Sequence, residues 1–96
     1  MIIPVTVVFQ SNGQKRFLMH NGNFVPIEPT GTAVIQCQQN VAELILFGIE
    51  GPSGSTATIT LTPQAPHILK IVGHPIKGKI AQGKTVWGDN RFFVVK

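Results

Sequence analysis

Apolar and polar residues alternate along most of this chain, and short turn signals interrupt the alternation every few positions. The clearest case is Ser55–Thr62, where three apolar residues share one parity and four threonines the other. Successive side chains of a strand point to opposite faces, so this pattern predicts a half-buried strand. The apolar set is Ala57, Ile59 and Leu61, and the polar set is Thr56, Thr58, Thr60 and Thr62.

The same reasoning predicts eight or nine short strands in all. Asn21-Gly22 favours a type I′ hairpin turn, Gly88-Asp89-Asn90 is predicted to be a turn that closes a final hairpin, and Gly73–Gly83 to be irregular. The strands are expected at Ile3–Gln10, Lys15–His20, Asn23–Ile27, Thr32–Gln39, Val41–Ile49, Ser55–Thr62, Ile68–Val72, Thr85–Trp87 and Arg91–Val95. The first three are expected to form a meander.

One segment, Val41–Phe47, is ambiguous. Asn40 followed by Glu43 suits a helix cap, and Gly48 could end a short helix. A buried strand fits the apolar run equally well and is favoured by the strand-like neighbours. The whole pattern predicts an all-β fold: a single-domain antiparallel β-sandwich over residues 1–96, Ig-like or jelly-roll-like, or a small barrel of eight to nine short strands.

Charged residues are scarce in this chain. They make up 12% of it, against about 25% in an average soluble domain. A small domain with so few charges is expected to cover part of its surface with copies of itself or with a larger assembly. The apolar start, Met1–Phe9, lacks the basic segment of a signal peptide. We therefore expect cytoplasmic synthesis without secretion, and no association with membranes.

The segment Gly78–Thr85, GKIAQGKT, matches the phosphate-binding loop pattern G-x-x-x-x-G-K-[ST] letter for letter. That loop works only between a buried strand and a helix, whose N-terminus and backbone amides hold the phosphates. Here Val86-Trp87-Gly88 follows, with a predicted turn in place of the helix. The match is interpreted as a coincidence, and nucleotide hydrolysis is not expected.

Basic residues gather near the end of the chain. Residues 70–96 hold six of them against one acid, whereas residues 1–69 hold two against three. Lysines beside an aromatic ring could contact a nucleic-acid backbone and stack a base, and a competing interpretation is a solvated loop that keeps the protein soluble. The predicted contact residues for a protein partner or a polyanion are Lys77, Lys79, Lys84, Trp87 and Arg91.

No catalytic or metal-binding constellation stands out in the sequence. His20, His67 and His74 lack ligands at the usual short spacing. Cys37, the only cysteine, has inward parity and is expected to be a buried, inert thiol. Four acids in the whole chain argue against paired-carboxylate chemistry. Neither a cofactor nor a metal is expected.

The sequence therefore predicts a non-enzymatic structural or assembly module that acts through protein–protein contacts. In composition it is similar to small accessory proteins of phage virions, such as capsid decoration or tail components. Either Ile3–Gln10 or Arg91–Val95 is expected to pair with a strand of a neighbour, or an apolar face is expected to dock on one. The alternative is a small nucleic-acid-binding β-barrel that uses the basic C-terminal third. A carbohydrate- or peptide-binding adhesin is a third option.

Overall fold

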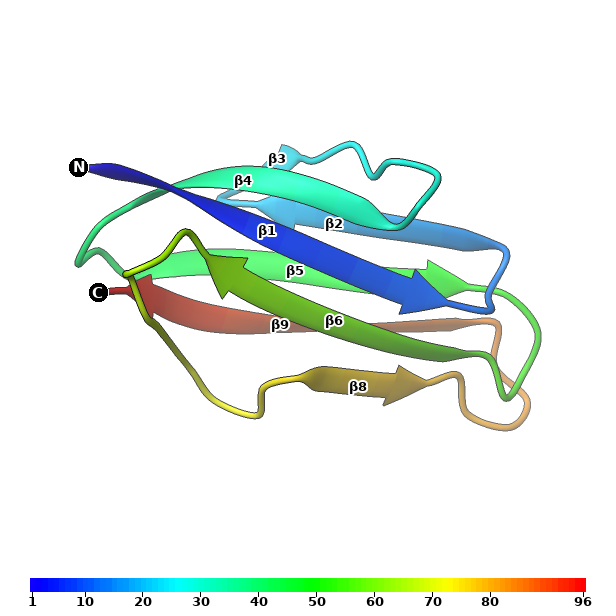
Figure 1. Ribbon diagram of the computed structural model, residues 1–96. Helices are drawn as coiled ribbons and strands as arrows, with labels where there is room; N and C mark the ends of the chain where they lie inside the picture. Colours follow the sequence, from blue (N-terminus) through cyan, green and yellow to red (C-terminus); the bar gives the residue numbers. More distant parts are fainter.

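The computed structural model describes residues 1–96 and contains nine strands in two antiparallel sheets (Figure 1). The four-stranded sheet has the order β4-β1-β6-β8, and the five-stranded sheet has the order β3-β2-β5-β9-β7. The strands are β1 (Ile2–Ser11), β2 (Lys15–His20), β3 (Asn23–Phe24), β4 (Thr32–Gln38), β5 (Glu43–Glu50), β6 (Thr56–Pro63), β7 (Leu69–Ile71), β8 (Ile76–Lys79) and β9 (Val86–Val95). The predicted all-β fold with two packed sheets is confirmed.

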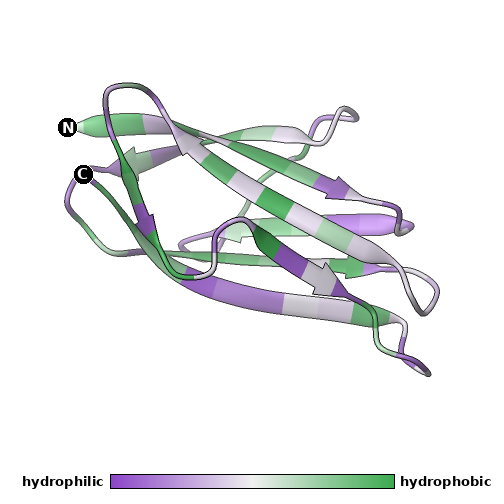
Figure 2. Ribbon diagram, turned by 60° about the horizontal axis from the view of Figure 1, so that its bottom comes forward, coloured by the Kyte–Doolittle hydropathy of each residue, from purple (hydrophilic) through white to green (hydrophobic).

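The core lies between the sheets and is built from the apolar parity of each strand. Figure 2 shows the alternation as bands of green and paler colour along the strands. Eighteen buried apolar residues form one cluster. The apolar set of Ser55–Thr62 and the predicted inward residue Cys37 belong to it. From the four-stranded sheet it includes Ile3, Val5, Val7, Phe9, Ala33, Ile35, Cys37, Ala57, Ile59 and Leu61.

The first three strands do not form the predicted meander. β1 lies in the four-stranded sheet and β2 in the other, so the turn between them crosses from one sheet to the other. The Asn21-Gly22 turn does connect β2 with β3, and both residues have positive φ, 49° and 85°. The strand predicted at Asn23–Ile27 ends at Phe24. Val25 N–H still donates to Leu18 C=O on β2, and the side chains of Val25 and Ile27 pack against the core.

The ambiguous segment is a strand. β5 begins at Glu43 and pairs with β2 on one side and with β9 on the other. Asn40 adopts φ 64° instead of capping a helix, a conformation that Asn tolerates better than most residues. Two neighbouring strands satisfy the backbone groups of β5, so the central position in the sheet decides between the two local options.

Two sequence predictions in the last third are wrong. The segment predicted to be irregular contains β8, whose Ile76, together with Ile80 just beyond the strand, is fully buried. The predicted closing hairpin is absent, because β9 runs unbroken from Val86 to Val95. Gly88-Asp89-Asn90 pairs in register with residues 46–48 of β5, and this pairing overrides the turn preference of the three residues.

No helix is long and apolar enough to cross a membrane.

Candidate functional site

The two sheets end in four edge strands, which differ in how well they are protected. β3 is two residues long, β7 is three residues long and carries Lys70, and β8 carries Lys77 and Lys79. β4 (Thr32–Gln38) is seven residues long, has no charge and no proline, and pairs one to one with β1 without a bulge. Short length, lysine, proline and bulges are the devices that protect edges, and β4 has none of them.

The predicted pairing strands are not at an edge. β1 lies between β4 and β6, and the Arg91–Val95 segment of β9 lies between β5 and β7. The prediction that either one is available to a neighbour is therefore wrong. Alternation marks a strand equally well in the interior and at the edge, so the sequence pattern could not distinguish these positions.

The free backbone groups of β4 follow from its ladder with β1. Gly31 and Gln39, which flank the strand, both hydrogen-bond toward β1, to Phe9 N–H and Met1 C=O. Residues of one parity point their backbone groups the same way, so Val34 and Gln36 point theirs outward. The outward groups at both ends are partly used: Thr32 C=O accepts from Glu28 N–H, and Gln38 N–H donates to the Glu43 carboxylate.

The predicted contact residues are distributed over two sheets. Lys77 and Lys79 are exposed on β8, and Lys84 is exposed in the loop before β9. Together with Lys70 they place basic charge on the side of the sandwich formed by β7 and β8, whereas residues 17–69 contain neither Lys nor Arg.

The other two contact residues have partners within the chain. Trp87 packs against Phe47 with ring centroids 5.7 Å apart, and its ring covers Gly78. Arg91 donates to Val72 C=O and to the Asp89 carboxylate, at 3.1 and 2.6 Å. Hydrogen bonds from Arg91 and from the Asn90 N–H hold the pKa of Asp89 below its usual range. The role of all five residues as partner contacts stays a prediction.

The outward face of the five-stranded sheet is the most apolar surface. The register places Phe17 beside Gly48, Met19 beside Leu46, and Phe92 beside Leu44 on this face. Phe92 on β9 and Phe24 on edge strand β3, beside Met19, are 68% and 75% exposed. A hollow of about 310 Å³ lies beside Phe17. Charge is sparse here, so this face adds to the expectation of a covered surface.

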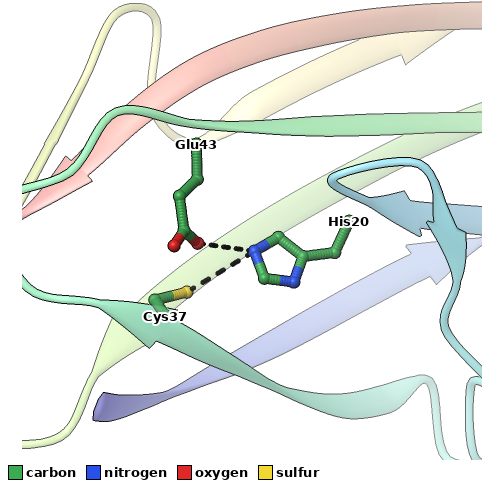
Figure 3. A group of neighbouring side chains, drawn as sticks. All are labelled: His20, Cys37 and Glu43. Carbon is green, nitrogen blue, oxygen red and sulfur yellow. Dashed lines mark hydrogen bonds and ion pairs between the residues drawn. The ribbon is translucent and has the colours of Figure 1, made fainter. Parts of the chain in front are cut away.

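A polar cluster joins the two sheets where β2, β4 and β5 meet (Figure 3). His20 ends β2, Glu43 begins β5, and Cys37 lies on the inward face of β4. His20 Nε2 lies 2.6 Å from Glu43 Oε1 and 3.9 Å from Cys37 Sγ. The other Glu43 oxygen accepts from Gln38 N–H at 2.9 Å.

Burial and hydrogen bonds set the protonation of this cluster. Burial raises the pKa of the Cys37 thiol to about 12, and the adjacent Glu43 carboxylate adds to the effect. Burial would also raise the pKa of Glu43, but hydrogen bonds from Gln38 N–H and His20 outweigh it and lower the pKa below its usual range. The cluster thus holds a neutral thiol beside a carboxylate.

Sequence reasoning did not bring these three residues together. His20 is 17 positions from Cys37 and 23 from Glu43, too far for any short ligand spacing. The inward parity of Cys37 was visible, and so was the position of His20 at the end of a strand. Only the pairing of β2 with β5, across the core from β4, makes them neighbours.

Comparison with family models, with curated proteins and with solved structures gives no match for this chain.

Proposed function

We propose that this protein is a non-enzymatic assembly module whose copies associate through the edge of β4. The observation that carries the proposal is the contrast between β4, long and unprotected, and the three other edges, which are short or carry lysine. Strand addition at such an edge supplies main-chain hydrogen bonds that need no special side chains. A capsid decoration or tail component of a virion is one setting for such a module.

A second copy of the chain fits this edge because the pattern of free groups is self-complementary. When two β4 strands lie antiparallel about a two-fold axis at Ile35, Val34 faces the partner's Gln36, and each exchanges two hydrogen bonds with it. Thr32 then faces the partner's Gln38. Thr32 N–H meets the free C=O of the partner's Gln38. The other two groups of this pair, Thr32 C=O and the N–H of the partner's Gln38, also face each other, but each already has a hydrogen bond within its own chain.

Neighbouring registers leave groups unpaired. An axis at Val34 places Gln36 against the partner's Thr32, whose C=O already accepts from Glu28 N–H. An axis at Gln36 places Val34 against the partner's Gln38, whose N–H already donates to Glu43. Buried backbone groups without partners cost about 1–3 kcal/mol each, so the axis at Ile35 is favoured.

The distribution of charge also favours association through the edge of β4. The chain carries a net charge of +4, and its lysines in strands β7 and β8 lie at the opposite edges of the two sheets. Two copies that meet at β4 keep these lysines far apart, which limits the repulsion between like charges. In Figure 1, β4 and β3 lie together on the side away from β8.

The test is the oligomeric state of edge variants, measured by light-scattering size-exclusion chromatography over a wide range of protein concentrations. Wild type is expected to be a dimer that persists in high salt. Val34→Lys and Gln36→Pro are expected to be monomers, because the first adds charge to the edge and the second removes an N–H that β1 does not use. Thr60→Lys, on the same face of interior strand β6, is the matched control and should remain dimeric.

Three results would overturn the proposal: a wild type that is monomeric at every concentration, edge variants that still dimerise, or loss of the dimer in the control. Elution with nucleic acid that high salt removes would favour the alternative, in which exposed lysines such as Lys77, Lys79 and Lys84 bind a polyanion.

A cross-linking experiment tests the register separately. The proposed pairing places Val34 against the partner's Gln36 at a Cα separation of about 5.5 Å, within the range of disulfides. A mixture of Val34→Cys and Gln36→Cys proteins is expected to form cross-linked dimers on mild oxidation, whereas each variant alone should not. A cross-link with Val34→Cys alone would place the axis at residue 34 instead.

A further inference from the structure

We propose that His20, Cys37 and Glu43 form a binding site for a zinc ion. Nitrogen, sulfur and carboxylate oxygen are the three ligand types of protein zinc sites. Here one atom of each type lies within 4.8 Å of the other two, and each residue comes from a different strand. The site adjoins the edge of β4, because Cys37 lies on that strand and Gln38 N–H donates to Glu43. All three ligands belong to one chain, so ion binding does not require the proposed association between copies.

The orientation of His20 is the central observation. The same nitrogen, Nε2, faces both Cys37 Sγ and Glu43 Oε1, as Figure 3 shows. A catalytic triad needs the two ring nitrogens on different partners, one on the acid and the other on the nucleophile. That division of roles is absent here. Three donor atoms that converge on one point are instead the arrangement that a metal ion requires.

The distances are close to those of a zinc site. Ideal zinc bonds at tetrahedral angles place nitrogen about 3.4 Å from oxygen and about 3.6 Å from sulfur. The corresponding separations here are 2.6 and 3.9 Å. Binding therefore requires Glu43 Oε1 to withdraw from the ring and Cys37 Sγ to approach it, each by less than about 1 Å. A zinc ion would take the place of the direct contact between His20 Nε2 and Glu43 Oε1, and binding would release the thiol proton of Cys37.

Surrounding groups are already placed to support the ligands. Gln38 N–H holds the second oxygen of Glu43, as partners around metal ligands commonly do. His20 Nδ1 makes no hydrogen bond within the chain, and the His20 side chain is 14% exposed against 7% for Glu43. The ion would thus arrive past His20, and a water molecule could complete the coordination from that side. Sulfur and nitrogen ligands favour zinc over magnesium or calcium, which prefer oxygen alone.

The first test is metal titration of wild-type protein that has been stripped with a chelator under reducing conditions. Calorimetry with Zn²⁺ is expected to give one ion per chain. Co²⁺, used as a coloured substitute, is expected to give a near-ultraviolet sulfur-to-cobalt charge-transfer band and visible bands typical of four ligands. Zn²⁺ at about a hundred times its dissociation constant should raise the melting temperature by about 10 °C. Absence of both the sulfur band and the thermal shift would overturn the proposal.

Variants assign the site. Cys37→Ser is expected to abolish the charge-transfer band, and His20→Asn or Glu43→Gln to weaken Zn²⁺ binding at least about tenfold. His67→Asn changes a half-buried histidine outside the cluster and should bind like wild type. Zn²⁺ binding that persists in Cys37→Ser but is lost in His67→Asn would show that the ion binds elsewhere. If a ligand variant fails to fold, the wild-type cobalt spectrum and thermal shift still decide.

Discussion

Replacement of Ile80 by alanine is expected to lower the free energy of unfolding by about 2–5 kcal/mol, the usual cost of shortening a buried Ile. Ile80 lies just after β8 and is completely buried. Its N–H donates to Ser55 C=O, and its C=O accepts from Gly54 N–H. The side chain thus packs against the core at a point where the backbone is fixed on both sides, which leaves little room for the chain to collapse into a cavity.

Lys84→Ala is the matched control from the same GKIAQGKT segment. In a phosphate-binding loop Lys84 would be the residue that reaches the phosphates, whereas here it is exposed in the loop before a strand. Its replacement should change stability by less than about 0.5 kcal/mol. Urea unfolding, followed by Trp87 fluorescence, measures the free energy of unfolding of both variants. A tolerant Ile80 beside a sensitive Lys84 would contradict the structural role assigned to this segment.

Strand positions and faces could be predicted from the sequence, because alternation of apolar and polar residues shows both where a strand lies and which side chains share a face. The inward residues of β1, β4 and β6 follow directly from parity, and all of them are buried. The Asn21-Gly22 turn was also predictable, because few residue pairs accept positive φ twice. These signals are local, and the fold agrees with them wherever no distant strand competes.

The failures have one physical cause, which is pairing between residues far apart in the chain. Gly88-Asp89-Asn90 has the composition of a turn, yet β5 supplies hydrogen-bond partners that keep it extended. Sheet order is equally non-local, so the sequence pattern could not show that β1 and β9 are interior and that β4 is the exposed edge. The cluster of His20, Cys37 and Glu43 could not be predicted from the sequence for the same reason.

The second large effect is expected at Gly78, whose replacement by valine should cost about 3 kcal/mol, as overpacking of a tight core does. A Cβ atom at this position would overlap atoms of the Trp87 ring. The indole cannot move inward, because it packs against Phe47. Valine should therefore push the ring toward water. Lys79→Val, an exposed position on the same strand, introduces the same side chain without this clash and should be tolerated.

Fluorescence measures the displacement directly, because Trp87 is the only tryptophan. Gly78→Val is expected to shift its emission to the red and to increase quenching by acrylamide, while Lys79→Val should leave both unchanged. The penalty should also shrink when Trp87→Leu makes room for the valine, since residues in contact are coupled. This result tests the predicted role of Trp87 as a residue that stacks on a base. An indole fixed over Gly78 is not free to stack on a base, so any nucleic-acid binding would have to rely on the exposed lysines. An unchanged emission in Gly78→Val would instead mean that the ring moves freely, and would restore Trp87 as a stacking residue.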